Sequence, residues 1–380
     1  MSILAYVGLD VHKEMISVHV IPDGPGLNPI RKELVNDRVS VKKYFSKLAE
    51  KYTLYCCYEA SGCGYVLHRW LKEINVDCII IAPSLVPKRS GDRVKTDRRD
   101  AEWLARMLRA DELTPVNIPT SEEEADRRVL RLRHTMVREV VMAKNYLLKF
   151  LLLNGRRYEG KSNWTKAHWA YLEELRFDGT DTFVYDEYFT LLKDKVAKLA
   201  KIDAFVQSLA QTDLYKERVQ RMCCLRGIAT LTAMVLITEV GDFRRFGSAR
   251  QLMSYFGLVP SEYSSGERQK KGSITKTGNS RCRGAIVEAA WKYMKPAGPS
   301  AALKLRQKDA PEDVVGHANK AQVRLHGKYW SIAVKKGPRK AVVATARELV
   351  GFVWGIMTGN CTDNNMSGHA ERVSAALAAA

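Results

Sequence analysis

The sequence lacks the signatures of several common protein classes. Its eight cysteines form no CxxC pair, so neither a zinc site nor a disulfide framework is indicated, and we interpret them as reduced, mostly buried apolar residues. No basic leader or cleavage site opens the chain, and no apolar run reaches the roughly 20 residues that a membrane-spanning helix needs. We therefore expect a soluble, cytoplasmic protein without a membrane partner.

Acidic residues are scarce relative to basic ones. The 380 residues contain 61 Lys and Arg against 42 Asp and Glu, which gives a formal net charge of +19. A basic excess of this size favours a polyanionic partner, and nucleic acid fits better than a membrane surface. The chain is long enough for two or three domains.

The first part of the chain, residues 1–118, alternates predicted strands and helices. A hairpin meander comes first, and the later strands are linked by helical patterns. This order predicts a mixed α/β sheet of the ribonuclease H or RuvC type. The predicted strands are 5–9, 15–21, 31–34, 53–58 and 78–82, and the predicted helices between them are 41–51 and 65–74.

Four carboxylates stand at the ends of these elements. Asp10 and Glu59 each follow a buried strand directly, whereas Asp97 and Asp100 lie three residues apart at the start of a helical pattern with Thr96 as its cap. Clustered carboxylates repel one another unless a cation neutralises them, and all-oxygen ligands suit Mg²⁺. This arrangement predicts metal-assisted phosphoryl transfer. The alternative is that Asp10 and Glu59 merely cap strand ends, and that Asp97 and Asp100 are ordinary acidic residues that the helix dipole favours in a first turn.

The second part, residues 119–221, predicts long amphipathic helices. A capping box at 121–124 opens one helix that runs to about Asn154, and a second runs from about Tyr188 to Leu209. The pair forms either an antiparallel hairpin within one chain or a coiled-coil arm that joins two chains. A row of arginines on the first helix suits nucleic acid or a solvated face: Arg127, Arg128, Arg131, Arg133 and Arg138.

The third part, residues 222–360, is predicted to be a helical unit, and residues 361–380 a disordered tail. Residues 225–233 predict a helix, a tight turn at Gly227 and a second helix, which is either a phosphate seat or a plain packed hairpin. A loop at 260–279 then combines hydroxyls, glycines and cations, a composition typical of phosphate contact. A last apolar helix is predicted at 341–357.

The loop at 260–279 carries several possible oxygen nucleophiles. A serine hydroxyl needs a base, a metal or dense positive charge to attack phosphorus. Four cations are available to bind phosphate and stabilise the developing oxyanion, namely Arg268, Lys270, Lys271 and Lys276. From the residues alone, the nucleophile stays open among the loop's hydroxyls, which include Tyr263, Ser264, Ser265 and Ser273.

Five motifs follow one another along the chain: GLDVHK, YEASGCGY, VKTDRRDAEWLARML, LRGIATLTAMVLITEVGDF and GLVPSEYSSGERQKKGSITKTGNSRCR. In this order they resemble the DEDD-type transposases of bacterial insertion sequences that are related to pilin-gene invertases. The likeness extends from residue 4 to about residue 358. Each motif alone is weak, but five in the same order are specific.

The resemblance implies a RuvC-like metal domain with Asp10, Glu59, Asp97 and Asp100 as ligands, and a transposase domain with Ser265 as nucleophile. It implies that donor and target double-stranded DNA are cut and rejoined through a covalent phosphoserine. It also implies a site assembled from two subunits of a dimer or tetramer, and a noncoding guide RNA that reads sequence by base pairing.

Three other functions fit parts of the sequence. A RuvC-like nuclease would hydrolyse DNA with an activated water, and Ser265 would then only bind phosphate. An actin-like sugar kinase also begins with a strand ending Gly-Leu-Asp, but the sequence has no second glycine-rich phosphate loop and is unexpectedly basic. A non-catalytic nucleic-acid-binding protein would bind normally after Asp10→Asn.

Overall fold

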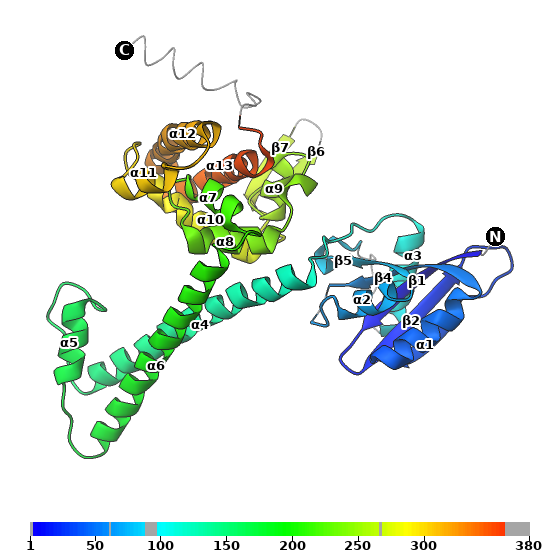
Figure 1. The fold of residues 1–380 in the computed structure, drawn as a ribbon, viewed down its shortest axis with the longest axis horizontal. Coiled ribbons are helices and arrows are strands. Elements are labelled where there is room, and N and C mark those ends of the chain that lie inside the picture. Colours follow the sequence, from blue (N-terminus) through cyan, green and yellow to red (C-terminus); the bar gives the residue numbers. More distant parts are fainter. Residues whose placement is uncertain (1–2, 61, 88–96, 266–267, 362–380) are drawn as a thin grey trace, which may run out of the picture. The chain divides into compact units, whose positions relative to one another are not determined.

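The computed structural model describes residues 3–60, 62–87, 97–265 and 268–361, and for Leu85 and residues 263–265 and 268–271 it describes the backbone alone. The chain divides into two compact units, Met1–Thr120 and Ser121–Ala380 (Figure 1). The predicted cap Thr96 and most of the predicted tail lie outside the described residues. The finer boundary at residue 222 stays a prediction.

The first unit is built on a five-stranded sheet in the order β3-β2-β1-β4-β5. The first three strands pair antiparallel as a meander, whereas β4 and β5 pair parallel to β1. The mixed α/β fold is thereby confirmed, and this order is consistent with the RuvC-like type. The strands are β1 (Ile3–Val11), β2 (Met15–Pro22), β3 (Ile30–Val35), β4 (Tyr52–Glu59) and β5 (Asp77–Ile81).

Helices cover both faces of this sheet because its central strands are apolar on both sides. Helices α1 (Arg38–Ala49) and α2 (Val66–Lys72) pack on one face in a single core cluster, which takes Cys56 and Tyr58 from β4. Helix α3 (Asp97–Arg109) packs on the other face, where Leu104 meets Cys57.

Gly8 in β1 sets how closely α3 approaches the sheet. A Cβ atom at this position would collide with the backbone of α3 at Ala101 and Ala105. Only glycine allows this approach, because any side chain would push the helix away. The glycine of the first motif therefore positions the helix that carries Asp97 and Asp100.

The second unit begins with two long helices, α4 (Ser121–Leu153) and α6 (Thr180–Leu209), which pack against each other. Leu147 and Leu192 are buried between them, and an ion pair joins Arg133 to Asp203. Of the two alternatives, the structure contains the pairing within one chain. A regular coiled-coil repeat stays a prediction.

The segment between these helices is more ordered than its sequence pattern predicts. It contains α5 (Lys166–Glu174), and α6 begins at Thr180 rather than near Tyr188. Aromatic side chains such as Trp169 and Phe177 pack onto the arm helices there. These contacts are tertiary, so no helical period in the local sequence announces them.

The remaining helices of the second unit surround one large hydrophobic core. They are α7 (Lys216–Cys223), α8 (Thr230–Val240), α9 (Ala249–Tyr255), α10 (Ser280–Ala290), α11 (Ala301–Gln307), α12 (Glu312–Lys336) and α13 (Pro338–Thr358). The basic stretch from Lys304, which the sequence presents as weakly patterned, is largely α11 and α12. The buried stripe of α12 includes Ala318 and Ala321, and such small residues make the apolar period faint.

Helix α13 is long and apolar enough to pass a length-and-composition test for a membrane span, with a mean hydropathy of 1.3. The helix is mostly buried in the core of the second unit, where Leu349 and Val353 are fully covered. A core helix meets the same test, and this burial explains the apolar composition. The charged residues Arg347 and Glu348 interrupt the helix, so the sequence shows no uninterrupted apolar run there.

Candidate functional site

The carboxylates Asp10 and Glu59 lie at the same edge of the sheet. Strands β1 and β4 run parallel, with Leu9 opposite Tyr58, so the residues that follow these two occupy neighbouring positions. The carboxyl ends of parallel strands meet at one edge, where the crossover connections leave open space. The predicted convergence of two strand ends is therefore present.

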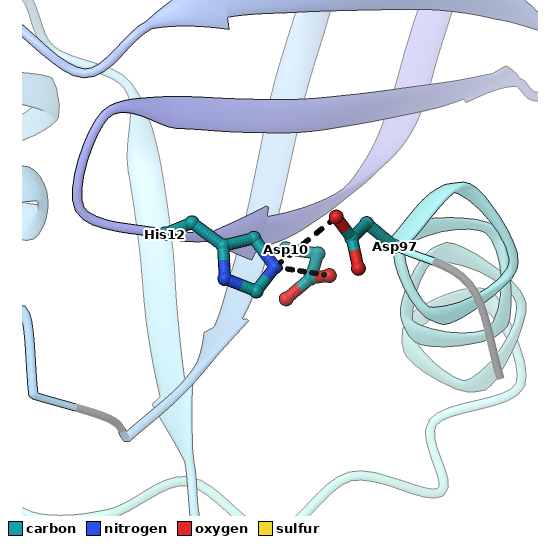
Figure 2. A group of neighbouring side chains, drawn as sticks. All are labelled: Asp10, His12 and Asp97. Atoms are coloured by element: carbon teal, nitrogen blue, oxygen red, sulfur yellow. Dashed lines mark hydrogen bonds and ion pairs between the residues drawn. The ribbon is translucent and has the colours of Figure 1, made fainter.

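The start of α3 brings two further carboxylates to this edge. Asp97 is the first residue of the helix and Asp100 lies one turn later, with charge close enough to act on Asp10. One ligand atom from each of Asp10, Asp97 and His12 lies within 4.8 Å of the others. Figure 2 shows His12 beside both carboxylates, with its Nε2 3.2 Å from Asp10 Oδ2 and 3.4 Å from Asp97 Oδ2.

Sequence reasoning assigned no role to His12. The signal was its position two residues after Asp10, which returns the side chain to the same side of an extended chain. Glu59 lies outside the compact group of three. Its charge acts on its own strand, where burial above all, and then Glu59, raises the pKa of Cys57. The structure thus brings Asp10 and Asp97 together most closely, with Asp100 and Glu59 around them.

The electrostatics of this group show an excess of negative charge. Burial raises the pKa of Asp10, and the charges of Asp97 and Asp100 raise it further, whereas His12 lowers it. In turn, Asp10 above all raises the pKa of His12, with a further contribution from Asp97. A protonated His12 therefore offsets part of the negative charge that a cation would otherwise neutralise.

The donor atoms fit a hard divalent cation. Carboxylate oxygens from two elements lie within one ion's reach, and Asp97 and His12 are exposed, so water and phosphate can approach. Mg²⁺ bound by few carboxylates keeps positions for phosphate oxygens. The arrangement can therefore hold a cation for phosphoryl transfer.

The predicted serine loop is a β-hairpin. Strands β6 (Pro260–Ser265) and β7 (Arg268–Ile274) pair antiparallel, and Ser265 is opposite Arg268 at the end of the ladder. Ser265 is therefore the last paired residue of its strand. The side chains of Ser265, Arg268, Lys270 and Lys271 lie outside the described residues, whereas Lys276 is exposed after the hairpin.

The base of this hairpin is clamped to the helices beneath it. Gly257 and Gly278 both have positive φ, and a Cβ on either would collide with the backbone of the opposite segment. Asn279 accepts the amide protons of Arg281 and Cys282 at the start of α10 and donates to Glu239 at 2.9 Å. The hairpin therefore emerges from a rigid support.

Glu239 of α8 lies at the centre of that support and is 3% exposed. Arg131 of α4 donates to both of its carboxylate oxygens, at 2.8 and 3.0 Å. Burial alone would raise the pKa of Glu239, but hydrogen bonds from Arg131 and Asn279 and the charges of Arg131 and Arg127 hold the pKa below its usual value. Sequence reasoning missed Glu239, because its partner Arg131 is 108 residues away.

The arginine row of α4 is largely used inside the unit. Arg127 donates to the Thr238 carbonyl, and Arg131 and Arg133 pair with Glu239 and Asp203. These contacts give Arg127, Arg131 and Arg133 a structural role, whereas a nucleic-acid contact along the row stays a prediction.

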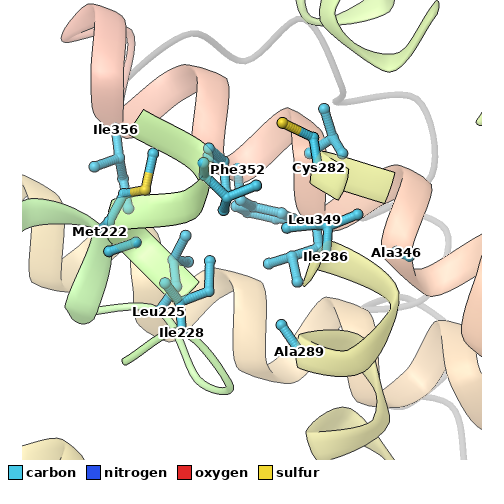
Figure 3. Close-up of a cluster of buried hydrophobic side chains, with 14 of the residues drawn as sticks. Met222, Leu225, Ile228, Cys282, Ile286, Ala289, Ala346, Leu349, Phe352 and Ile356 are labelled. Carbon is cyan, nitrogen blue, oxygen red and sulfur yellow. The ribbon is translucent and has the colours of Figure 1, made fainter. Parts of the chain in front are cut away.

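The helix–turn–helix at Gly227 has the predicted form, with positive φ at the glycine. A Cβ there would collide with the Ala289 carbonyl of α10, so close packing explains the residue. Figure 3 shows the core that this turn joins, where Met222, Ile286 and Phe352 come from α7, α10 and α13. A phosphate seat at this turn stays a prediction.

Two family models match the chain. One, a transposase model of the DEDD IS110 type, matches residues 7–154, and another, described as transposase IS116/IS110/IS902 family, matches residues 219–304. The first match contains all four predicted carboxylates and the second contains the serine hairpin. The fold and the matches together define the class of protein as a DNA transposase.

Relatives narrow this class. The chain is 38% identical over 359 residues to the putative transposase y4qE of Sinorhizobium fredii. This alignment covers 93% of this chain and 88% of the relative. It is 32% identical over 339 residues to the transposase for insertion sequence element IS1533 of Leptospira borgpetersenii. That alignment covers 87% of this chain and 97% of the relative. The pilin gene-inverting protein of Moraxella bovis is more distant, at 26% over 246 residues, or 63% and 66%. The chain belongs to the IS116/IS110/IS902 family of insertion-sequence transposases.

Proposed function

We propose that this transposase cuts and rejoins double-stranded donor and target DNA through a covalent phosphoserine at Ser265, with Mg²⁺ held by Asp10, Glu59, Asp97 and Asp100. The observation that carries the metal assignment is the approach of Asp10 and Asp97 within one ion's reach. A bound Mg²⁺ would supply positive charge to the reacting phosphate. The protein acts in the cytoplasm at the nucleoid.

The chemistry at Ser265 conserves phosphodiester bonds. Its hydroxyl oxygen attacks a backbone phosphorus, a new Ser–O–P bond forms, and the P–O bond to the leaving sugar oxygen breaks. The serine proton leaves to a base or water, and the leaving sugar oxygen is protonated. A sugar hydroxyl of the other DNA then attacks the phosphoserine, which releases the serine and restores the backbone.

The nucleophile's environment supports a phosphate contact. Ser265 is the last residue of β6 and pairs with Arg268 of β7. Lys270 and Lys271 follow on β7, and Lys276 comes after that strand. Cations stabilise the charge that develops on phosphate oxygens. A rigid hairpin base at Asn279 would keep this strand in place during attack.

The resemblance of the five motifs supports the remaining parts of the proposal. A noncoding guide RNA pairs with donor and target DNA, and a dimer or tetramer assembles the site from the metal unit of one subunit and the serine unit of another. The net charge of +19 suits a protein that holds both RNA and DNA backbones.

The test compares wild type with Ser265→Ala in Mg²⁺ with the candidate guide RNA and labelled junction and target DNA. After denaturing electrophoresis, we expect label at the protein's mass in wild type and none in the variant, because the change removes one oxygen and no charge. Ser264→Ala is the matched control and should still form the adduct. An adduct lost only in Ser264→Ala would move the nucleophile by one residue.

The second candidate is a metal-dependent nuclease that activates water, since a carboxylate group of this kind also supports hydrolysis. Free cleaved DNA from both wild type and Ser265→Ala, with no adduct in either, would establish this candidate and overturn the role of Ser265.

A further inference from the structure

A basic groove lies on the first unit between strands β2 and β3 and helix α3. Two hollows of about 280 and 440 Å³ share His19 and Arg31 in their lining. Arg98, Arg106 and Arg109 contribute from α3. The wall on the strand side is formed where His19 and Arg31 are opposite each other in the β2–β3 ladder.

The groove starts beside the candidate metal centre and leads away from it. Ser17, which lines the first hollow, is the pairing partner of Asp10, and Arg98 follows Asp97 directly. The later residues of α3 line the second hollow, up to Arg109. At ~1.5 Å per helical residue this path is about 16 Å long, which at about 3.4 Å per nucleotide matches roughly five nucleotides of one strand.

The groove keeps a net positive charge after its internal pairs are counted. Arg31 and Arg106 share the carboxylate of Glu102, Arg98 pairs with Glu33 at 3.6 Å, and Arg109 pairs with Asp23 at 3.2 Å. Four arginines thus face three carboxylates, and Lys32 lines the first hollow as a further cation. Each guanidinium has five N–H donors, so one carboxylate contact leaves others for phosphate.

The floor of the groove contains a polar group that the protein itself does not satisfy. His19 is 3% exposed and lines both hollows, and its Nδ1 has no hydrogen-bond partner among the described residues. Buried polar atoms without partners are uncommon, and each calls for an explanation such as an ordered water. The Nδ1 atom itself is closed off from the surface, so the argument for phosphate rests on the charge of the groove.

We propose that this groove binds the phosphodiester backbone of the nucleic-acid strand that enters the metal centre, with Arg31, Arg106 and Arg109 as its phosphate contacts. The inference rests on the proposed function, because it extends the path of the strand from the reacting phosphate. Charge complementarity and the groove's start at the metal centre select this occupant. DNA and RNA share the chemistry, so both are tested.

The test measures binding of the full chain to labelled single-stranded DNA and RNA by fluorescence anisotropy over a series of salt concentrations. Arg31→Gln and Arg109→Gln should each weaken binding roughly three- to tenfold and reduce the slope of log K against log salt by about 0.7 to 0.9 per lost contact. The matched control is Arg38→Gln. Arg38 begins α1, which packs on the opposite face of the sheet from α3, and pairs with Glu73 at the end of α2. The affinity and slope of this variant should equal those of wild type.

A variant of opposite sign separates the proposal from damage to the fold. Glu102 pairs with both Arg31 and Arg106, so Glu102→Gln should free two guanidiniums and tighten binding. The strand type whose affinity responds to all three variants is the one that occupies the groove.

Two results would overturn the proposal: unchanged affinity and slope in both arginine variants for DNA and RNA alike, or weaker binding in Glu102→Gln. These measurements need no covalent chemistry. Adduct formation by Ser265→Ala would refute the proposed nucleophile and leave the binding result intact, so the two failures are distinguishable.

Discussion

At the scale of single residues, the side chains of the candidate metal centre have opposite effects on the pKa of Asp10. Burial and two neighbouring carboxylates raise the pKa of Asp10, and the histidine two residues later lowers it. Asp10 gains this environment because it follows the buried run of β1 and therefore ends inside the sheet's edge. Because the carboxylates of this site repel one another, a bound cation stabilises the folded protein, and removing one of the negative charges costs little stability.

The first prediction follows from this repulsion. Asp10→Asn should abolish DNA cleavage, keep the thermal midpoint of the metal-free protein at or above that of wild type, and remove the rise in midpoint that Mg²⁺ causes. A ligand that binds only the folded state raises stability by RT ln(1 + [L]/Kd), and the variant lacks a ligand oxygen. Thermal unfolding with and without Mg²⁺ measures all of this.

The control for this prediction is Asp77→Asn, an exposed carboxylate at the start of β5. It should respond to Mg²⁺ as wild type does. An Asp10→Asn protein that keeps the full Mg²⁺ response would refute the role of Asp10 as a ligand.

At the scale of elements, one buried carboxylate joins three helices. Glu239 of α8 receives Arg131 of α4 and Asn279, which caps α10. Asn279 also follows the hairpin formed by β6 and β7, so helix α4 and the base of this hairpin share the Glu239 carboxylate. Movement of α4 would therefore disturb the hairpin's support.

The second prediction tests this junction. Arg131→Met should destabilise the protein by about 2 kcal/mol, because it removes two charge-assisted hydrogen bonds and leaves a buried carboxylate with fewer partners. The partial exposure of Arg131 keeps the figure at the low end. Chemical denaturation measures the loss, and Arg128→Met, which removes an exposed pair with Glu124, is the control and should cost under about 1 kcal/mol.

The same junction gives a pH dependence. The pKa of Glu239 is lower in the folded protein than its usual value, so its stabilisation is present above the usual pKa and is lost as pH falls through the folded pKa. In the Arg131→Met variant this acid loss should be smaller, because the partner that lowers the pKa is gone. Equal acid sensitivity in both proteins would contradict the assignment.

At the scale of the whole molecule, the two units carry different parts of the proposed reaction. The carboxylates belong to Met1–Thr120, and the serine hairpin belongs to Ser121–Ala380. Because the chain belongs to a transposase family, the sugar-kinase alternative is wrong. The division raises the question of which subunit's serine meets which subunit's carboxylates.

The third prediction answers it by complementation. A mixture of Asp10→Asn and Ser265→Ala proteins, each inactive alone, should regain part of the protein–DNA adduct if one subunit supplies the metal unit and another the serine unit. The adduct should migrate with the Asp10→Asn protein, which keeps the serine, and a size tag on one protein identifies it. No adduct in the mixture, while wild type forms it, would mean that each site uses a single chain.

Several features were determined by the sequence alone. The apolar runs that end at Asp10 and Glu59 are local, and the parallel pairing of β1 with β4 then brings these two carboxylates to one edge. The long helices α4 and α6 also follow from a local apolar period. Local patterns succeed here because the buried face repeats with the period of the element.

The tertiary structure decided the rest, because it depends on residues far apart in the chain. The approach of His12 to Asp97 spans 85 positions and has no local signal. Helix α5 forms where aromatic side chains pack against α4 and α6, and α12 forms where small alanines fit a closely packed core. The pairing of Arg131 with Glu239 and the basic groove beside α3 likewise exist only once separate elements pack, since charge and burial are then set by neighbours rather than by sequence order.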